Sequence, residues 1–251
     1  MASADHRTYH ARADLLQGRV ILVTGAGDGI GRAAALAFAA HGATVILLGR
    51  TGRKLESLND EIVRAGYPQP AIAILDLEQA QGPAYFDVVD RLREKFGKLD
   101  GLLHNAAILG DRTPLEQYDI GVWHQVLHVN LTAPFVLTQV LMPLLRESPD
   151  ASVLFTTSGV GRRGKAYWGA YAVSKFGVEG LAQVLADETR SSTRIRVNCI
   201  NPGATRTGMR RKAYPGEDAG QRPEPAALMA SYLYLMGPDS AAVTGESLDC
   251  Q

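Results

Sequence analysis

A short apolar run that leads directly into a glycine-rich turn and then a helix constrains this chain more than any other feature. Residues 19–24 read Arg-Val-Ile-Leu-Val-Thr, as expected for a strand buried on both faces of a parallel sheet. The turn Thr-Gly-Ala-Gly-Asp-Gly-Ile-Gly follows at 24–31, and an alanine-rich helix continues to about His41, where Gly42 ends it. Parallel strands are joined by crossover helices, so this opening predicts a βαβ unit.

The same turn has the composition of a phosphate cradle. Backbone N–H groups and the N-terminus of a helix attract an anion, and glycines allow it to approach the backbone closely. Between a strand and a helix, this pattern indicates a dinucleotide site rather than a simple tight turn. The candidate contacts are Gly25, Asp28, Gly29, Ile30 and Gly31.

The alternation of strand and helix continues along the chain. We expect further strands over 44–48, 71–75, 101–104, 152–156, 195–200 and 247–249, and helices over 53–65, 83–96, 122–146, 226–236 and from Tyr171 onward. Neither a repeat nor a low-complexity linker divides them, which favours one doubly wound α/β sheet. We expect a polar N-terminal arm over 1–17 and one domain over 18–251. Within that domain, the polar segment 206–225 is either a lid or disordered.

Composition excludes several classes of function. Lys and Arg together number 26, as do Asp and Glu, so no basic surplus suggests a nucleic-acid partner. Cys199 and Cys250 form no disulfide framework and no metal-ligand spacing, which suits a reducing compartment. The N-terminus has no apolar core, and we expect no run long enough to span a membrane. We expect a cytoplasmic protein without a nucleic-acid, membrane or metal partner.

Tyr171 and Lys175 lie four positions apart, on one face of the expected helix. A nearby cation stabilises a phenolate and lowers the pKa of tyrosine from about 10, so the pair can act as a general acid/base. The alternative is that Tyr171 packs and Lys175 is solvated. Ser158 ends the preceding strand at the carboxyl edge of the sheet, where ligands bind in open α/β folds.

Three further positions leave alternatives open. Pro134 cannot donate to the Asn130 carbonyl, which predicts either a kinked helix or a backbone oxygen that holds something else. Asp76, with Leu77, either receives an adenine ring or caps the next helix. His104 has no acidic or nucleophilic partner at a recognisable spacing, so we interpret it as structural.

Taken together, these features resemble the short-chain dehydrogenase/reductase family from about Arg19 to Asp249. The matching stretches are Thr24-Gly25 with Gly29-Ile30-Gly31 (cofactor loop), Asn105-Ala106-Ala107 (after the fourth strand), the set Asn130, Ser158, Tyr171 and Lys175, and Pro202-Gly203 with Thr205 and Thr207 (nicotinamide side). Within the family, residues 45–50, 168–171 and 198–203 look most like the bacterial YciK-type oxidoreductases. One departure is that His104 and Ala107 stand where the family usually has Asn and Gly.

The resemblance implies a sheet of order 3-2-1-4-5-6-7 and hydride transfer between a nicotinamide cofactor and a carbonyl or alcohol substrate. Tyr171 would exchange the hydroxyl proton, Ser158 would hydrogen-bond the carbonyl oxygen, and Lys175 would hold the nicotinamide ribose. Asn130 would anchor a water that leads to Lys175. Family members are usually dimers or tetramers, so we expect a homo-oligomer. The alternative function is a cofactor-binding sensor or scaffold without useful turnover.

The second strand indicates which cofactor is used. NAD-specific folds carry an acidic residue about 20 positions after the glycine loop, but here Gly49 stands there and Arg50 follows. A guanidinium can bind a 2′-phosphate bidentately, and Thr51 or Arg53 can add a donor. The acidic Asp28 in the glycine loop argues against NADP, although its side chain can instead cap the helix. For Arg50 we expect little else nearby to pair with. We predict NADP(H), with NAD(H) use as the alternative if Arg50 is merely solvated.

Two basic clusters follow the fifth and sixth strands. Their members are Arg162, Arg163 and Lys165, and then Arg206, Arg210, Arg211 and Lys212. They form either a solvated rim, partly balanced by Glu217, Asp218 and Glu224, or a surface that steers an anionic carbonyl substrate. Tyr167 and Trp168 add either an apolar wall to the pocket or ordinary core packing.

Overall fold

Seven parallel strands form a single sheet in the order β3-β2-β1-β4-β5-β6-β7 in the computed structural model, which describes residues 5–251. The strands are β1 Val20–Thr24, β2 Thr44–Gly49, β3 Ala71–Ile74, β4 Gly101–His104, β5 Ala151–Thr156, β6 Ile195–Asn201 and β7 Ser247–Asp249. The fold class and strand order expected from the sequence are confirmed.

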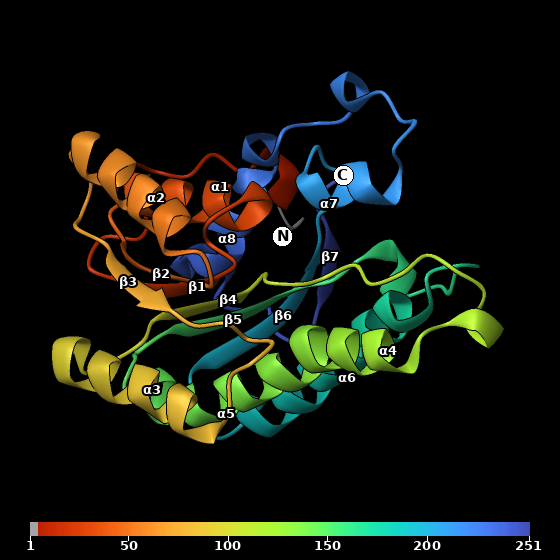
Figure 1. The fold of residues 1–251 in the computed structure, drawn as a ribbon. Coiled ribbons are helices and arrows are strands. Elements are labelled where there is room, and N and C mark those ends of the chain that lie inside the picture. Colours follow the sequence, from red (N-terminus) through yellow and green to blue (C-terminus); the bar gives the residue numbers. More distant parts are fainter. Residues whose placement is uncertain (1–4) are drawn as a thin grey trace.

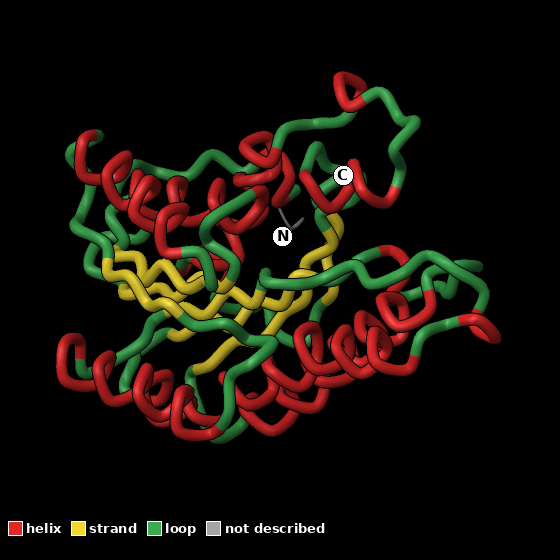
Figure 2. The backbone as a smooth tube through the Cα atoms, in the orientation of Figure 1, coloured by secondary structure: helices red, strands yellow, loops and turns green. Residues whose placement is uncertain are grey.

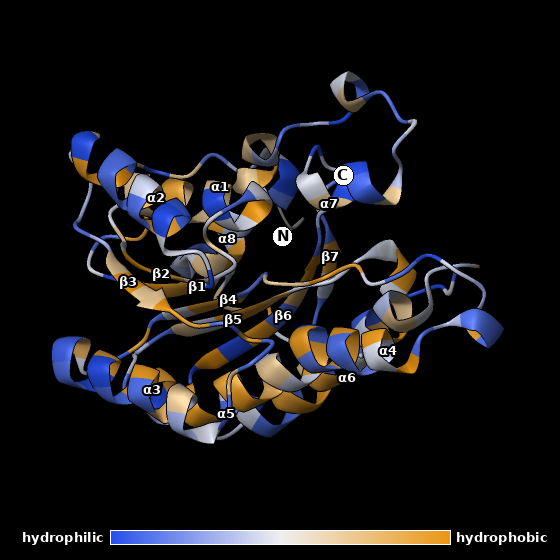
Figure 3. Ribbon diagram, viewed as in Figure 1, coloured by the Kyte–Doolittle hydropathy of each residue, from blue (hydrophilic) through white to orange (hydrophobic). Residues whose placement is uncertain are grey.

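Helices cover both faces of this sheet (Figures 1 and 2). One layer contains α1 Gly29–Ala40, α2 Gly52–Arg64 and α8 Met229–Met236, and the other contains α3 Gly82–Phe96, α4 Ile120–Leu127, α5 Ala133–Arg146 and α6 Gly169–Arg190. Each layer buries its own apolar core against the strands. Figure 3 shows the corresponding pattern, with apolar strands and hydrophilic outer helix faces.

Strand register brings the loops that carry chemistry to one edge. In β1, Val23 lies beside Leu47 of β2 on one side and Leu103 of β4 on the other. Strands β2 and β3 lie on one side of β1, and strands β4 to β7 lie on the other. The carboxyl ends of β1 and β4 therefore flank the point where strand order reverses. In open α/β sheets this is where ligands bind.

The helix expected over 122–146 is interrupted in its hydrogen bonding. Residues His128–Thr132 form a π-helical segment between α4 and α5, in which the Ala133 N–H donates to the carbonyl five residues back, that of His128. Pro134 removes the donor that an α-helix would offer to Asn130. Such π segments occur often at functional sites.

The continuous helical run Ile120–Arg146 is long and apolar enough, by length and composition alone, to cross a membrane. This corrects the expectation that no run reaches that length. Its α5 part buries Leu137, Leu141 and Leu145, and these residues belong to the core on that face of the sheet. The run therefore has the packing of a core helix.

Both polar segments expected outside the regular fold make specific contacts. In the N-terminal arm, Leu15 and Leu16 are buried and the Tyr9 hydroxyl donates to Asp239 at 2.6 Å; residues 1–4 lie outside the described residues. The segment 206–225 contains α7, Gly208–Ala213. Its carboxylate Glu217 accepts from both Arg210 and Arg222 at 2.6 Å.

Candidate active site

Tyr171 and Lys175 share the buried face of α6, one turn apart. Both side chains are almost wholly inaccessible, at 8% and 3% exposure. The Lys175 ammonium lies 5.7 Å from the centre of the Tyr171 ring and donates to the Thr156 carbonyl at 2.8 Å. The alternative in which Lys175 is solvated is therefore wrong.

Burial controls the proton affinity of both groups. It raises the pKa of Tyr171 to about 12, against a hydrogen bond from Ser158 that lowers it. Burial likewise lowers the pKa of Lys175 to about 8. The expectation that Lys175 lowers the Tyr171 pKa is not met, because loss of hydration outweighs an ammonium that binds the Thr156 carbonyl instead. At neutral pH the phenol holds its proton and can donate it.

Ser158 is presented to Tyr171 by the end of β5. It occupies the N-cap position of a short turn, Gly159–Gly161, but makes no capping hydrogen bond. Its hydroxyl therefore remains available to Tyr171. Gly161 fits against Lys175, where an added Cβ would lie 2.7 Å from the lysine Cβ.

The Asn130 side chain forms hydrogen bonds within the protein through both its oxygen and its nitrogen. Its oxygen accepts from the Ile108 N–H at 2.8 Å, and its amide donates to the Ile108 carbonyl at 2.9 Å and to the Ser174 hydroxyl at 3.1 Å. These bonds join the π-helical segment to α6 and to the loop after β4. Sequence reasoning did not identify Ile108 or Ser174, although the spacing of Ser174 from Tyr171 places it on the same helix. Any water that Asn130 holds would therefore bind its backbone carbonyl, which receives no hydrogen bond from Pro134.

The glycine turn has space only for glycine at its closest contacts. Gly25 has a φ of +67°, and a Cβ there would lie 3.0 Å from Ala106 Cα. A Cβ on Gly31 would collide with the Gly25 carbonyl oxygen. Gly29 has a φ of +52°, and a Cβ there would lie 3.4 Å from the Thr207 methyl group. The turn thus forms a bare backbone cradle, which fits the diphosphate of a dinucleotide.

Two side chains hold this cradle in place. The Thr24 hydroxyl accepts from the N–H groups of Asn105 and Ala106, both at 3.0 Å, a role that the motif comparison did not identify. Asp28 caps α1 by accepting from the Gly29 N–H at 2.8 Å, as expected, and also pairs with Lys54 at 2.5 Å. Its negative charge is therefore partly neutralised. Ile30, in the first turn of α1, and Ala107, in the loop after β4, are both partly exposed.

The loop after β6 closes the opposite side of the site. Thr205 is buried and donates to the Pro202 carbonyl at 3.2 Å, while Gly203 has a φ of +72°. Gln251 donates to the same carbonyl at 2.5 Å. Thr207 caps α7 by accepting from the Arg210 N–H at 3.1 Å.

At the carboxyl end of β2, the expectation that Arg50 has little to pair with is wrong. Arg50 is 61% exposed, but it lies 3.5 Å from a carboxylate oxygen of Glu78, so it does have a partner. Glu78 also accepts from Gln125 at 2.6 Å. Thr51 begins α2 without a side-chain capping bond, which leaves its hydroxyl available.

Asp76 does not cap the following helix, because Gln81 occupies the N-cap position of α3. Asp76 instead accepts from the N–H of Glu78 at 3.1 Å and so fixes the turn that carries this carboxylate. Leu77 beside it is buried.

His104 has the partners of a structural residue. It is buried, shares a 2.8 Å hydrogen bond with the Thr138 hydroxyl, and stacks on Phe155 at 4.7 Å between ring centres. Burial lowers its pKa to about 3, so the ring is neutral.

Internal carboxylates neutralise three members of the two basic clusters. Arg162 pairs with Glu179 and Asp249. Arg206 pairs with Glu224, and Arg210 with Glu217. Solvation and internal pairing therefore account for most of the basic rim.

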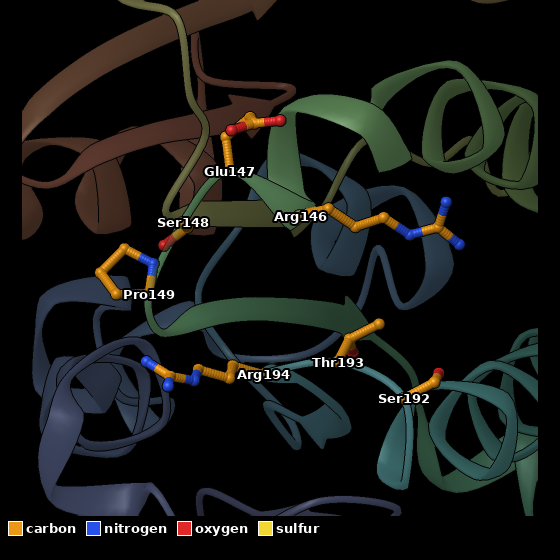
Figure 4. A pocket seen from close by; sticks show the side chains of 7 residues that line it. All are labelled: Arg146, Glu147, Ser148, Pro149, Ser192, Thr193 and Arg194. Atoms are coloured by element: carbon orange, nitrogen blue, oxygen red, sulfur yellow. The ribbon is translucent and has the colours of Figure 1, made fainter.

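A surface hollow of about 580 Å³ lies away from this site (Figure 4). It is lined by Arg146, Glu147, Ser148, Pro149, Ser192, Thr193 and Arg194. These residues precede β5 and β6, so they mark the amino edge of the sheet. Residues 5–251 contain no group of three or more His, Cys, Asp or Glu side chains placed to hold a metal ion.

A doubly wound sheet with a bare glycine cradle and a buried Tyr–Lys pair at one edge defines a dinucleotide-dependent class of protein. The chain matches the family model for short chain dehydrogenases over residues 19–218 and belongs to that family. It is 50% identical to the uncharacterised oxidoreductase YciK of Escherichia coli K12, across 97% of this chain and 96% of that protein.

Solved structures agree with this assignment. A chain from Pseudomonas syringae described as a short chain dehydrogenase shares 57% identity, with a TM-score of 0.96 over 97% of this chain and 98% of that one. A short chain dehydrogenase from Shigella flexneri 2a, solved in complex with NADP, shares 50% identity and a TM-score of 0.93 over 96% of this chain and 100% of that one. The predicted family and its YciK-like subgroup are confirmed.

Proposed function

We propose that this oxidoreductase is NADP(H)-dependent and interconverts a carbonyl compound and an alcohol, with Tyr171 as the proton donor or acceptor. The observation that carries the proposal is the buried Tyr171 phenol, with the Ser158 hydroxyl beside it and Lys175 one turn further along α6. In the reducing direction a bound NADPH would supply the hydride. Tyr171 gives its proton to the carbonyl oxygen, and Ser158 donates a hydrogen bond to that oxygen as negative charge develops.

Several residues would hold the cofactor. The glycine cradle from Gly25 to Gly31 offers backbone N–H groups to the diphosphate, and Lys175 would bind the nicotinamide ribose. Arg50 would exchange its single long contact with Glu78 for the 2′-phosphate, a stronger, bidentate partner. The NADP bound to the Shigella flexneri relative supports this choice. Use of NAD(H) remains the alternative.

The remaining cofactor contacts belong to the same proposal. They are Asp28, Thr51, Asp76, Leu77, Asn105, Ala106, Ala107, Pro202, Gly203, Thr205 and Thr207. The proposal also includes one catalytic domain over 18–251 with 206–225 as a substrate lid, a homo-oligomer, and a cytoplasmic location.

A cofactor-binding scaffold without turnover is the competing function. The test is a panel of aldehydes, ketones and quinones, with oxidation of NADPH followed at 340 nm. We expect at least one member to make the protein consume NADPH. A protein that binds NADPH tightly and consumes none with any member would support the scaffold.

A further inference from the structure

Three loops bring an unusual group of side chains together next to Tyr171. Arg112 comes from the loop after β4, Lys165 and Trp168 from the loop before α6, and Tyr214 from the end of α7; we call these four residues the Arg112 cluster. The Trp168 ring lies 5.6 Å from the Tyr171 ring, between centres. The Arg112 guanidinium lies 4.8 Å from the centres of both the Trp168 and Tyr214 rings.

The two cations of this cluster retain unused hydrogen-bond donors. Arg112 donates to the Ala213 carbonyl and forms no ion pair within residues 5–251. A guanidinium has five N–H donors, so most of them remain free. Lys165 donates to the Tyr214 hydroxyl at 3.1 Å and likewise lacks a carboxylate partner in the described chain. By contrast, Arg210, which also stacks on Tyr214, is neutralised by Glu217.

A buried donor beside them is also unsatisfied. Trp168 is only 7% exposed, yet its indole N–H has no acceptor among the residues that the structure describes. Buried polar groups almost always have a hydrogen-bond partner. An oxygen atom of a bound ligand would supply one.

The surroundings indicate how such a ligand is built. Leu109, Val160 and Met209 pack around Trp168 and Tyr171, so the space next to the phenol is apolar. The tyrosine before Trp168, Tyr167, has a φ of +69°, a conformation that non-glycine residues avoid and that often marks functional turns. Two cations and an unsatisfied N–H thus border an apolar cluster that contains the candidate proton donor, Tyr171.

We propose that the substrate carries a carboxylate or phosphate in addition to its carbonyl, and that Arg112, Lys165 and the Trp168 N–H bind this anionic group. The proposal rests on the proposed function. One indole ring separates Tyr171 from Arg112, which selects a short apolar linker between the carbonyl and the anion. Arg112 then joins Lys165 in the role that the sequence analysis had considered for the two basic clusters.

Three aldehydes of matched shape test this inference: 4-carboxybenzaldehyde, its methyl ester, and 4-formylphenyl phosphate, each with NADPH. We expect kcat/KM for at least one anionic aldehyde to exceed that of the ester by about tenfold or more, as charge-assisted hydrogen bonds imply. Whichever anion is preferred distinguishes a carboxylate substrate from a phosphate one.

Variants then locate the effect. Arg112→Gln should raise KM for the anionic aldehydes and so remove most of the preference, with a much smaller effect on the ester. Trp168→Phe keeps an aromatic ring and removes the N–H, so it should also lower kcat/KM selectively for the anionic aldehydes. Arg163→Gln, the same charge change in the loop that carries Lys165, should have no effect. All variants should bind NADPH normally, which reports that the site is folded.

Two outcomes overturn the inference while the proposed function stands. One is an ester reduced as well as both anions. The other is an equal loss from Arg163→Gln and Arg112→Gln, which would reflect general surface charge. If no aldehyde or other carbonyl compound is reduced by protein that binds NADPH, the proposed function fails and this inference fails with it.

Discussion

The Lys175 ammonium donates to the Thr156 carbonyl at 2.8 Å, at the end of the strand that leads into the Ser158 loop. Lys175 therefore holds the end of the strand that leads to Ser158, and its ammonium also lies next to the Tyr171 ring. Because both side chains are buried, the protein holds an ammonium and a phenol in a place where neither is well hydrated. The predictions below follow from this arrangement and its surroundings.

Stability should depend on pH through Lys175. Its pKa is 10.5 when unfolded and about 8 when folded, so between these values the unfolded chain binds more protons than the folded one. Stability relative to a Lys175→Met variant should therefore rise as pH increases from 8 to 10.5, by at most roughly 3 to 4 kcal/mol at about 1.4 kcal/mol per pKa unit. Urea unfolding of both proteins across this range measures it. A constant difference between them would contradict the assignment.

Pro134 should matter because of the donor it lacks. Pro134→Ala restores an N–H that can bond to the Asn130 carbonyl and so would displace the water that the family resemblance implies there. We expect kcat to fall roughly tenfold, since proton transfer would lose its relay, while the free energy of unfolding changes by no more than about 1 kcal/mol. Pro143→Ala, a second proline inside α5, is the matched control and should leave kcat unchanged. Unaltered kcat in Pro134→Ala would remove the Asn130 carbonyl from the mechanism.

Arg50 should select the cofactor. Wild-type protein should bind NADPH more tightly than NADH, and Arg50→Asp should lose NADPH affinity by about tenfold to a hundredfold through lost charge-assisted bonds. Arg64→Asp makes the same change in the last turn of α2 and is the control for general charge. Fluorescence titration with both cofactors measures this. Tighter NADH binding by the wild type, or an unchanged preference in Arg50→Asp, would overturn the assignment.

Exposed apolar side chains on two helices predict self-association. Phe135 on α5 and Val173, Phe176 and Val184 on α6 are each at least 45% exposed. Apolar groups that gather on a surface usually mark an interface. We expect a dimer or tetramer by light scattering, and a smaller species for Phe176→Glu. Ile74→Glu, at an exposed position on β3, should not alter the assembly. A wild-type monomer at micromolar concentration would contradict the prediction.

Local sequence patterns predicted most of the sheet. Every strand was expected within about one residue of its observed ends, because buried parallel strands are short apolar runs closed by glycine or polar residues. Helix α7 was missed, since Gly208–Ala213 is short and basic and is recognisable only by its Thr207 cap. Pro134 was the one local signal of the π-helical segment. It predicted an interruption of the helical hydrogen bonds but not a π-helical conformation.

Contacts between side chains on distant loops could not be predicted from local sequence patterns. Glu78 meets Arg50, and Arg112 meets Trp168, only after the sheet has brought separate loops to one edge. The same holds for the Tyr171 pKa: the sequence shows a lysine four residues away, but the cost of burial, which dominates, depends on the packed site. Motif spacing therefore suggested the candidate residues, whereas the fold determined their partners and proton affinities.

The most direct measurement is the turnover of Tyr171→Phe on the best carbonyl substrate, with NADPH binding measured on the same preparation. The variant removes one hydroxyl and keeps the buried ring, so we predict unchanged NADPH affinity and a fall in kcat of about 100-fold to 10,000-fold, the range expected when a general acid is lost. Nearly full turnover by a variant that still binds NADPH would contradict the central claim that Tyr171 transfers the proton.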